Sequence, residues 1–584
     1  MYRNKRESPT EKIKMIEQIK NDVHKVLETA IQIAVNINEL KIDKIPKIIF
    51  SPTKAPEHGD IASPIALSLA KSAGIGPRQV AEIIIDKIDL EKQPLINQID
   101  VAGPGFINIF IDNNWMASSL KEIHLRGDKF GYTEHGQDKK ILVEFVSANP
   151  TGPLNIVSGR AAAVGSTIIN LLNMAGYQAT SEFYINDAGG QVLRLGASLD
   201  VRYRQQFGYS NLEIPEDGYH GQYLVELSEE LKQEVGNKYL DLSENDRIRI
   251  FCDLAVERLL SDQKKSLERF GVEFDVWSSE KDIRESGAPE QIIQSFKDQN
   301  LLYESEGATW FKMTNFGDDK DTVVIKSDGE YTYFVPDAAY HQNKFNRGFH
   351  TLIDLLGPDH QGHISHLECL LRALGYDQSR LECLIIQQVS LVDSTGQKVE
   401  MSKRKGQLIT LDNLLDRLGE SVDEHFAVDV ARYFFLNRSN NSHLDFDFDL
   451  ALKRANDNPV FYLQYAYARS CSIFREMTQR GLGAYEFQKA DLSLLNSIDE
   501  QQMIRKMAEF PQLVIASADN RQPHRLVNYL QDLANQFHTF YNKSRVLNVE
   551  QIDLSYARLA LVSCLQIVLR NGLKILGLST PERM

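Results

Sequence analysis

Apolar residues recur at helical spacing near the start of the chain, and strand-like patterns follow them. Between Ser8 and Leu40 they alternate with Lys and Glu, which predicts one long amphipathic helix. KIPKIIF (44–50) then predicts a strand, APEHGDIASPIALSLAKSAG (55–74) a loop entering a helix closed by Gly74, and PRQVAEIIIDKI (77–88) a second helix. IDVAGPGFINIFI (99–111) alternates like a strand broken by a Gly-Pro-Gly turn. We therefore expect an α+β module over residues 1–125.

The pattern changes in the middle of the chain, from residue 126 to 455. A strand from Ile141 to Ala148, a Pro/Gly loop, a helix from Arg160 to Met174 and a strand from Ala179 to Ile185 follow one another. This order is typical of a parallel, doubly wound (Rossmann-type) sheet, whose ligands bind at the carboxyl ends of strands. A mostly helical insertion at about 190–300 is expected to split that sheet, because strand-like runs return at 309–313, 321–326, 331–335, 351–356 and 381–392.

The last part of the chain is helical in pattern. Apolar stripes of period 3.6 run through 460–474, 523–547 and 557–578, which predicts an all-α bundle over residues 456–584. The expected fold class is α/β, with an N-terminal α+β module and a C-terminal helical bundle.

Composition narrows the class of protein. With 584 residues, 42% hydrophobic and 25% charged, the chain can build several cores. No uninterrupted apolar stretch approaches the ~20 residues of a membrane span, and the polar start has no signal-peptide core, so a cytoplasmic protein is expected. Five scattered cysteines without a CxxC pair indicate reduced packing residues. The net charge of −15 argues against a protein that coats DNA or RNA, although local basic patches can still hold RNA.

Two distant segments contain the candidate chemistry. In SANPTGPLNIVSGR (147–160), Pro150, Gly152 and Pro153 stiffen a loop, and Gly159 allows close backbone approach where helix amides favour phosphate. In VEMSKRKG (399–406), three cations precede a glycine and can neutralise a triphosphate. Taken singly, the first segment is also compatible with a simple connector and the second with solvated surface.

Together the two segments resemble the HIGH and KMSKS signatures of class I aminoacyl-tRNA synthetases. Further segments, in order, are similar to the arginyl-tRNA synthetase family: 56–71, 101–111, 143–154, 182–191, 315–341, 354–406, 458–469 and the ending LRNGLKILGLSTPERM (569–584). The resemblance implies an enzyme that makes arginyl-adenylate from L-arginine and ATP and transfers arginine to the 3′ end of tRNA(Arg). Mg²⁺ is expected with ATP, because this hard cation suits triphosphate oxygens.

The resemblance also implies roles for individual residues. Tyr333 and Asp337 would face the substrate guanidinium, which needs a carboxylate and flat or hydrogen-bonding walls. A surface strand and a helix N-cap are the alternative for this pair. The other expected arginine-binding residues are Glu144, Ser147, Asn149 and Asp359. The expected ATP-binding residues are Pro150, Thr151, Gly152, Pro153, Asn155, Ser158, Gly159, His360 and Met401, and the expected catalytic ones are Ser402, Lys403, Arg404 and Lys405.

The chain departs from its family at both ATP signatures. Asn155, Ile156, Val157 and Ser158 stand where class I enzymes usually have His-Ile-Gly-His, so neutral donors replace two imidazoles. Glu400 likewise replaces the first KMSKS lysine. The chain is then either a working synthetase, assisted by His360 and His363, or a catalytically weak paralogue that binds tRNA or senses arginine. A metal site at His360, His363 and His366 lacks a completing carboxylate and cysteine set, so no structural metal is expected.

The C-terminal bundle contains the expected tRNA-binding residues. Phe461, Tyr462, Tyr465 and Arg469 lie on neighbouring helical turns, where they can stack bases or simply fill the core. In the family this domain reads the anticodon, the tail ending at Met584 packs nearby, and the N-terminal module touches the tRNA elbow. Nothing resembles a dimerisation coiled coil, so a monomer is expected.

Overall fold

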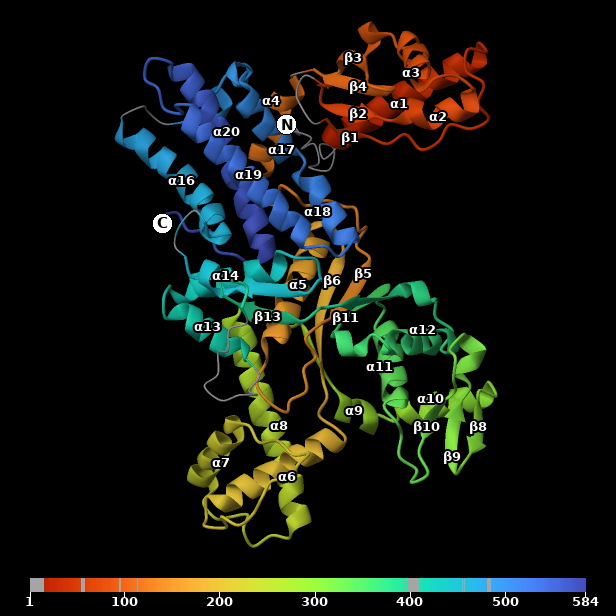
Figure 1. The fold of residues 1–584 in the computed structure, drawn as a ribbon, viewed down its shortest axis with the longest axis vertical. Coiled ribbons are helices and arrows are strands. Elements are labelled where there is room, and N and C mark those ends of the chain that lie inside the picture. Colours follow the sequence, from red (N-terminus) through yellow and green to blue (C-terminus); the bar gives the residue numbers. More distant parts are fainter. Residues whose placement is uncertain are drawn as a thin grey trace, which may run out of the picture.

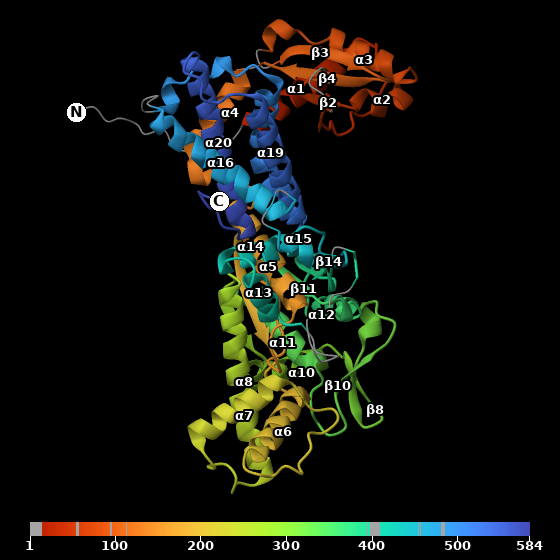
Figure 2. The ribbon, with the colours of Figure 1, turned by 60° about the vertical axis from the view of Figure 1, so that its left-hand side comes forward.

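The computed structural model describes residues 15–53, 58–93, 96–112, 114–393, 395–397, 409–453, 455, 457–480 and 485–584. These residues form an elongated molecule (Figure 1, Figure 2). The N-terminal module and the C-terminal helices lie at one end, the parallel sheet lies in the middle, and helices α6–α8 form the other end.

The N-terminal module packs helices against a four-stranded antiparallel sheet of order β1-β2-β4-β3. Its elements are α1 (Met15–Asn36), β1 (Ser51–Pro52), β2 (Ile61–Ser63), α2 (Ile65–Ala73), α3 (Pro77–Asp86), β3 (Ile96–Ala102) and β4 (Phe106–Ile111). The long helix predicted over 8–40 is α1 within the described residues, and the two shorter predicted helices are α2 and α3. Gly74 ends α2 in a left-handed conformation, as predicted. The strand predicted at 44–50 is wrong: pairing begins only at Ser51, after Pro46, whose missing N–H weakens a strand.

The central sheet has five parallel strands in the order β12-β11-β5-β6-β7. They are β5 (Lys140–Glu144), β6 (Gln178–Ile185), β7 (Val276–Ser279), β11 (Thr351–Leu356) and β12 (Leu381–Ile385). The predicted β-loop-α-β unit is confirmed, with α5 (Ile156–Met174) as its helix. A Cβ on Gly165 would lie 2.2 Å from the Phe145 ring, so α5 approaches β5 only because this residue is glycine.

Two excursions leave the sheet. The first is the helical insertion α6 (Gly190–Gln205), α7 (Gln222–Val235) and α8 (Glu244–Arg269), which has its own hydrophobic core. The second, between β7 and β11, contains α9 (Glu280–Glu285), α10 (Ala288–Asp298), β8 (Leu302–Ser305), β9 (Ala308–Phe311), β10 (Thr322–Ile325) and α11 (Phe334–Asn346). Helix α12 (His363–Ala373) connects β11 to β12.

Three predicted strand runs do not extend the parallel sheet. Those at 309–313 and 321–326 form β9 and β10 of a separate antiparallel sheet. The run at 331–335 instead enters α11 at Phe334, since Pro336 is tolerated in a first helical turn and the apolar side chains before it are buried. The run at 381–392 divides into β12 and β13 (Val389–Val392), and β13 pairs with β14 (Leu444–Asp447).

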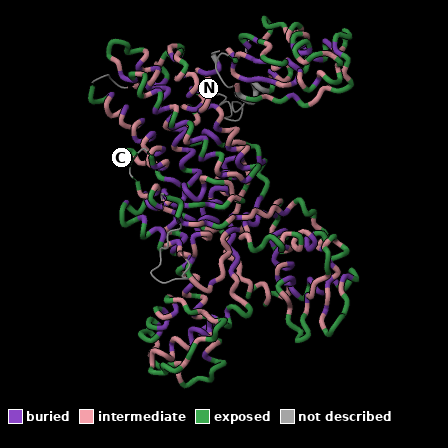
Figure 3. The backbone as a smooth tube through the Cα atoms, in the orientation of Figure 1, coloured by how far each residue is buried: buried purple, intermediate pink, exposed green. Residues whose placement is uncertain are grey.

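The region 456–584 is helical, as predicted, and contains α16 (Pro459–Gln479), α17 (Ile498–Ala508), α18 (Phe510–Asp519), α19 (His524–Lys543) and α20 (Ile552–Leu576). Three more helices precede it: α13 (Leu411–Gly419), α14 (Glu424–Leu436) and α15 (Phe448–Ala451). Helix α4 (Asn114–Arg126) packs against α17 and α20, and the Cys564 thiol lies 3.3 Å from the Leu120 carbonyl oxygen. By length and composition α20 is apolar enough to cross a bilayer, but 61% of its most apolar stretch is buried (Figure 3).

Candidate active site

The carboxyl ends of β5, β6 and β11 open into a cavity of about 990 Å³. The chain leaves β5 toward β6, whereas β11 lies on its other side, which is the strand-order reversal where doubly wound sheets bind ligands. Nine of the predicted site residues line this cavity: Glu144, Ser147, Asn149, Asn155, Ser158, Tyr333, Asp337, Asp359 and His360.

The backbone is strained where β5 enters the cavity. Val146 and Ser147 have φ angles of 69° and 39°, in the left-handed region that β-branched residues rarely adopt. This turn directs the Ser147 hydroxyl to donate to Glu144 Oε1 at 2.9 Å and to accept from the Tyr184 N–H at 3.1 Å. Strain of this kind concentrates at functional sites, where surrounding contacts hold it in place.

Three carboxylates from adjacent strands lie side by side under the cavity. Glu144 of β5 is in register with Asp354 of β11 and with Glu182 of β6, so the three side chains point to one face of the sheet. The Asp354 and Glu182 residues are 4% and 0% exposed. Buried carboxylates require positive partners, and α11 supplies them.

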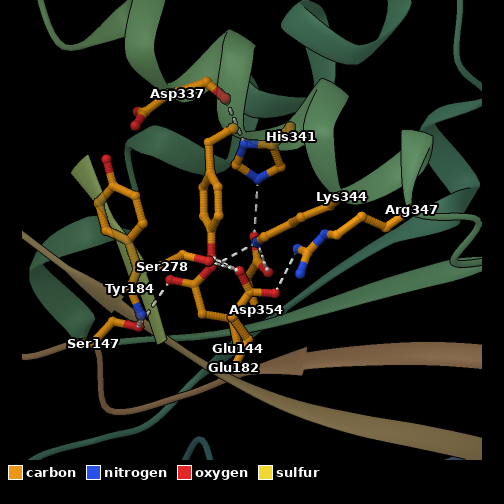
Figure 4. Close-up of polar contacts among 11 residues, drawn as sticks. Glu144, Ser147, Glu182, Tyr184, Ser278, Asp337, His341, Lys344, Arg347 and Asp354 are labelled. Carbon is orange, nitrogen blue, oxygen red and sulfur yellow. Dashed lines mark hydrogen bonds and ion pairs between the residues drawn. The ribbon is translucent and has the colours of Figure 1, made fainter. Parts of the chain in front are cut away.

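Helix α11 lays basic side chains across the three acids (Figure 4). Lys344 is fully buried, and its Nζ donates to Glu144 Oε2 at 2.6 Å and to Asp354 Oδ1 at 3.0 Å. Arg347 donates to Glu182 Oε2 at 2.6 Å. Burial alone would lower the pKa of Lys344, but the two carboxylates offset this effect and raise it above its ordinary value. Lys344 therefore remains a cation inside the protein.

The same helix joins this network to the cavity wall. The ring nitrogens of His341 lie 2.8 Å from the Asp337 carbonyl oxygen and 3.1 Å from Asp354 Oδ2. The Tyr340 hydroxyl donates to Glu182 Oε1 at 3.0 Å. Because residues 337, 340, 341 and 344 share one helical face, the Asp337 position is tied to the acids on the strands.

Tyr333 and Asp337 lie at the start of α11, at the mouth of the cavity. Tyr333 is 51% exposed, and its ring lies 5.4 Å from that of His363. Burial, reinforced by Glu280 and Glu144, raises the pKa of the Asp337 carboxyl to about 6. The alternative of a surface strand is not observed here, since Tyr333 immediately precedes the first helical residue. A cation that binds at this mouth would favour the ionised form of the Asp337 carboxyl.

The variant signature residues pair with each other. The Asn155 side chain caps α5 by accepting from the Ser158 N–H at 2.8 Å, and the Ser158 hydroxyl lies 3.2 Å from the same oxygen. Val157 lines the cavity beside them. The Ser158 hydroxyl must therefore leave Asn155 before it can donate to a phosphate.

The histidines predicted to assist the variant loop also line this cavity. His360 and His363 both line the cavity, with ring centroids 5.5 Å apart. Burial and the neighbouring His360 and His366 lower the pKa of His363, which favours its neutral form. Among the described residues, no group of three or more His, Cys, Asp or Glu side chains is arranged so that it could hold a metal ion.

Other predicted ATP residues lie elsewhere. Pro150, Thr151, Gly152 and Pro153 form the loop between β5 and α5 and do not line the cavity. Gly159 is buried in α5, where a Cβ would lie 2.8 Å from Leu411, so its position favours helix packing. The remaining predicted residues, Met401, Ser402, Lys403, Arg404 and Lys405, lie outside the described residues.

The predicted tRNA-binding residues separate into two groups. Phe461 and Met584 line a cavity of about 500 Å³ between α16 and the C-terminal tail. Tyr462 and Tyr465 pack on the His538 ring of α19 at 4.4 and 5.8 Å, and Arg469 lies 3.0 Å from its Nδ1. These α16 side chains are half-buried, so they retain surface for contacts beyond the bundle.

Sequence reasoning missed the ionic network behind the cavity. Its additional members are Glu182, His341, Lys344, Arg347 and Asp354. Two signals were available: an acid inside each of the apolar strand runs TSEFYI and TLIDLL, and basic residues three and four apart after Asp337. A charge inside a buried strand requires a partner, which these spacings supply.

Comparison with known proteins agrees with this geometry. Residues 119–428 match the family described as "tRNA synthetases class I (R), catalytic domain". Residues 17–111 match "Arginyl tRNA synthetase N terminal domain", and residues 463–584 match "DALR anticodon binding domain". With a parallel sheet and a cavity at its carboxyl edge, these matches define a class I aminoacyl-tRNA synthetase.

Relatives along the whole chain specify the family. An arginine–tRNA ligase of Shouchella clausii is 44% identical over 93% of this chain and 95% of its own, and one of Symbiobacterium thermophilum is 42% identical over 98% and 100%. The chain belongs to the arginine–tRNA ligase family.

Solved structures have the same fold. A putative arginyl-tRNA synthetase of Campylobacter jejuni has a TM-score of 0.73 at 29% identity and covers 81% of this chain and 100% of its own. The Thermus thermophilus arginyl-tRNA synthetase also has a TM-score of 0.73, at 20% identity, over 97% of this chain and 100% of its own.

Proposed function

We propose that the chain activates L-arginine with ATP to arginyl-adenylate and pyrophosphate and transfers the arginyl group to the 3′-terminal adenosine of tRNA(Arg). The observation that supports this most directly is the half-buried Asp337 at the cavity mouth, backed by a charged network that runs to Glu144 and Ser147. This arrangement suits a long substrate with a cationic end and an α-amino group.

The two ends of arginine have different partners in this proposal. Asp337 and Tyr333 face the guanidinium, whose planar donors match a carboxylate and an aromatic or hydroxyl wall. Glu144, Ser147 and Asn149 hold the α-amino and carboxylate groups at the strained end of β5. Held there, the substrate carboxylate attacks the α-phosphorus of ATP, and pyrophosphate leaves.

The nucleotide occupies the side of the cavity lined by the start of α5 and by Asp359 and His360. Backbone amides at the start of α5 and the cations Lys403, Arg404 and Lys405, with Met401 and Ser402, neutralise the leaving pyrophosphate. Mg²⁺ would enter with ATP, because this hard cation suits triphosphate oxygens, and would supply positive charge to the phosphates.

The remaining assignments concern tRNA and the state of the enzyme. Phe461, Tyr462, Tyr465, Arg469 and Met584 contact the anticodon loop through stacking and hydrogen bonds. The N-terminal module contacts another part of the tRNA. We assign the enzyme to the cytoplasm as a monomer, with the divisions 1–125, 126–455 and 456–584.

Arginine-dependent exchange of pyrophosphate into ATP tests the proposal. With tRNA(Arg) present, exchange should require arginine and should fail with lysine. A chain that binds arginine or tRNA(Arg) but shows no exchange above background is instead a catalytically weak binding protein, an alternative favoured by the missing HIGH histidines.

A further inference from the structure

Helix α8 joins the helical insertion to the central sheet. Phe251, Ala255 and Leu259, in the middle of α8, belong to the core of the insertion, and Leu267 in its last turns belongs to the main core. At 26 residues it is about 39 Å long. One rigid element therefore belongs to both parts of the protein.

Gln263, near the end of α8, holds the loop between β5 and α5. It is 1% exposed, and its Nε2 donates to the Asn149 carbonyl at 3.1 Å and to the Gly152 carbonyl at 2.8 Å. The two acceptors fix the amide orientation, because the reverse orientation would turn Oε1 toward two oxygens. Oε1 is buried without a hydrogen-bond partner, a cost that the two loop contacts offset.

The last turns of α8 also hold the helix that follows the second signature segment. The Ser266 hydroxyl donates to Asp412 Oδ2 at 2.5 Å, and Arg269 contacts Asp412 and Asp416 at 3.2 and 2.7 Å. Asp412 and Asp416 belong to α13, which begins three residues after the segment 401–408. The two held elements also touch, since the Leu411 N–H donates to the Leu154 carbonyl at 2.8 Å.

We infer that Gln263 is a positioning residue for the ATP-dependent step: through it, α8 holds the 149–155 loop of the first ATP signature in place beside α13. This inference rests on the proposed function for its chemistry. Gln263 does not line the cavity and touches no reacting atom. Its loss should weaken ATP use while arginine binding is retained.

The test compares Gln263→Met with a matched control. Methionine fills similar space but removes both hydrogen bonds to the loop. In the control, Gln206→Met, a half-buried glutamine loses one hydrogen bond, to Ser228 at 3.2 Å, inside the insertion and away from the loop. In full-length protein, KM for ATP in pyrophosphate exchange should rise about tenfold in Gln263→Met, while the Kd for arginine stays within about twofold. Gln206→Met should change neither value.

Hydrogen–deuterium exchange gives a readout that does not depend on activity. Peptides covering 148–158 and 409–416 should exchange about tenfold faster in Gln263→Met than in wild type, and Gln206→Met should leave them unchanged. The inference would be overturned if these peptides exchanged hydrogen for deuterium at the same rate in both variants. If the wild-type protein shows no pyrophosphate exchange, the proposed function is wrong. The hydrogen–deuterium exchange of these peptides then tests by itself whether Gln263 holds the loop.

Discussion

The two halves of the active-site cavity are built from different kinds of contact. The half lined by α11 rests on buried ion pairs, in which Lys344 and Arg347 neutralise acids on three strands. At the start of α5, by contrast, the signature residues Asn155 and Ser158 are joined by neutral hydrogen bonds. Removing one member of a buried charge network strongly destabilises the fold, whereas substitutions in a neutral, partly exposed loop change stability little. Under the proposed function, the contrast predicts that substitutions in the charged half affect arginine use more strongly than substitutions at Asn155 or Ser158 affect ATP use.

Removing Lys344 tests the charged half most severely. Lys344→Met leaves Glu144 and Asp354 buried without their shared cation, which should destabilise the fold by ~3–5 kcal/mol. Urea unfolding followed by tryptophan fluorescence, to which Trp277 of β7 contributes, measures this loss. The fraction of Lys344→Met that is folded should also lose arginine-dependent pyrophosphate exchange.

A matched buried pair separates general instability from loss of the site. Arg247 and Asp200 form an ion pair inside the insertion, with side chains 7% and 4% exposed. Arg247→Met should lower stability but leave KM for arginine unchanged. If Lys344→Met keeps the wild-type KM for arginine, the network has no part in positioning the substrate pocket.

Replacing Asp337 removes the acid at the cavity mouth without disturbing the buried pairs. Asp337→Asn retains the side-chain shape, but the guanidinium loses a charge-assisted contact of about 1.5–3 kcal/mol, so KM for arginine should rise about 10- to 150-fold. KM for ATP should stay within about threefold. An equal rise in KM for arginine and KM for ATP would mean that Asp337 supports the fold of the cavity and does not bind the guanidinium.

The raised pKa of Asp337 predicts a pH dependence. With a pKa of about 6 in the free protein, Asp337 is ionised above that pH and protonated below it. Arginine binds the ionised form, so KM for arginine should rise about tenfold per pH unit below 6 and level off above it. Steady-state exchange between pH 5 and 8 measures this slope, and Asp337→Asn should abolish it. A slope that persists in the variant would assign the titration to another group.

The fold was predictable where one local pattern decided the structure. The β5-α5-β6 unit and the C-terminal helices follow from periodicity that tertiary packing reinforces. The segment 331–335 misled, because its aromatic alternation resembles a strand while the buried Phe334 and Val335 begin α11. The local pattern alone does not distinguish a strand from the start of a helix when either one would bury these apolar residues.

The candidate site was predictable only in its cavity-lining layer. Glu144 was expected from the resemblance, but its partner Lys344 lies 200 residues away, and no spacing rule connects them. The shared register of Glu144, Glu182 and Asp354 exists only after the three strands pair. Charge pairing between residues so far apart in sequence depends on which strands are neighbours in the sheet. The sequence pattern did not determine that order.

Restoring one histidine to the neutral half should give the smallest effect and the sharpest contrast. In Ser158→His the cap on α5 survives, because Asn155 accepts from the backbone N–H of residue 158. An imidazole there should raise the pyrophosphate exchange rate by up to about tenfold, less than the ~10²-fold that a removed donor costs in an evolved site. Ser158→Ala serves as the control and should stay near wild type, since the hydroxyl already contacts Asn155. A rate that falls in Ser158→His would show that the loop and the cations after residue 402 are adapted to a neutral signature.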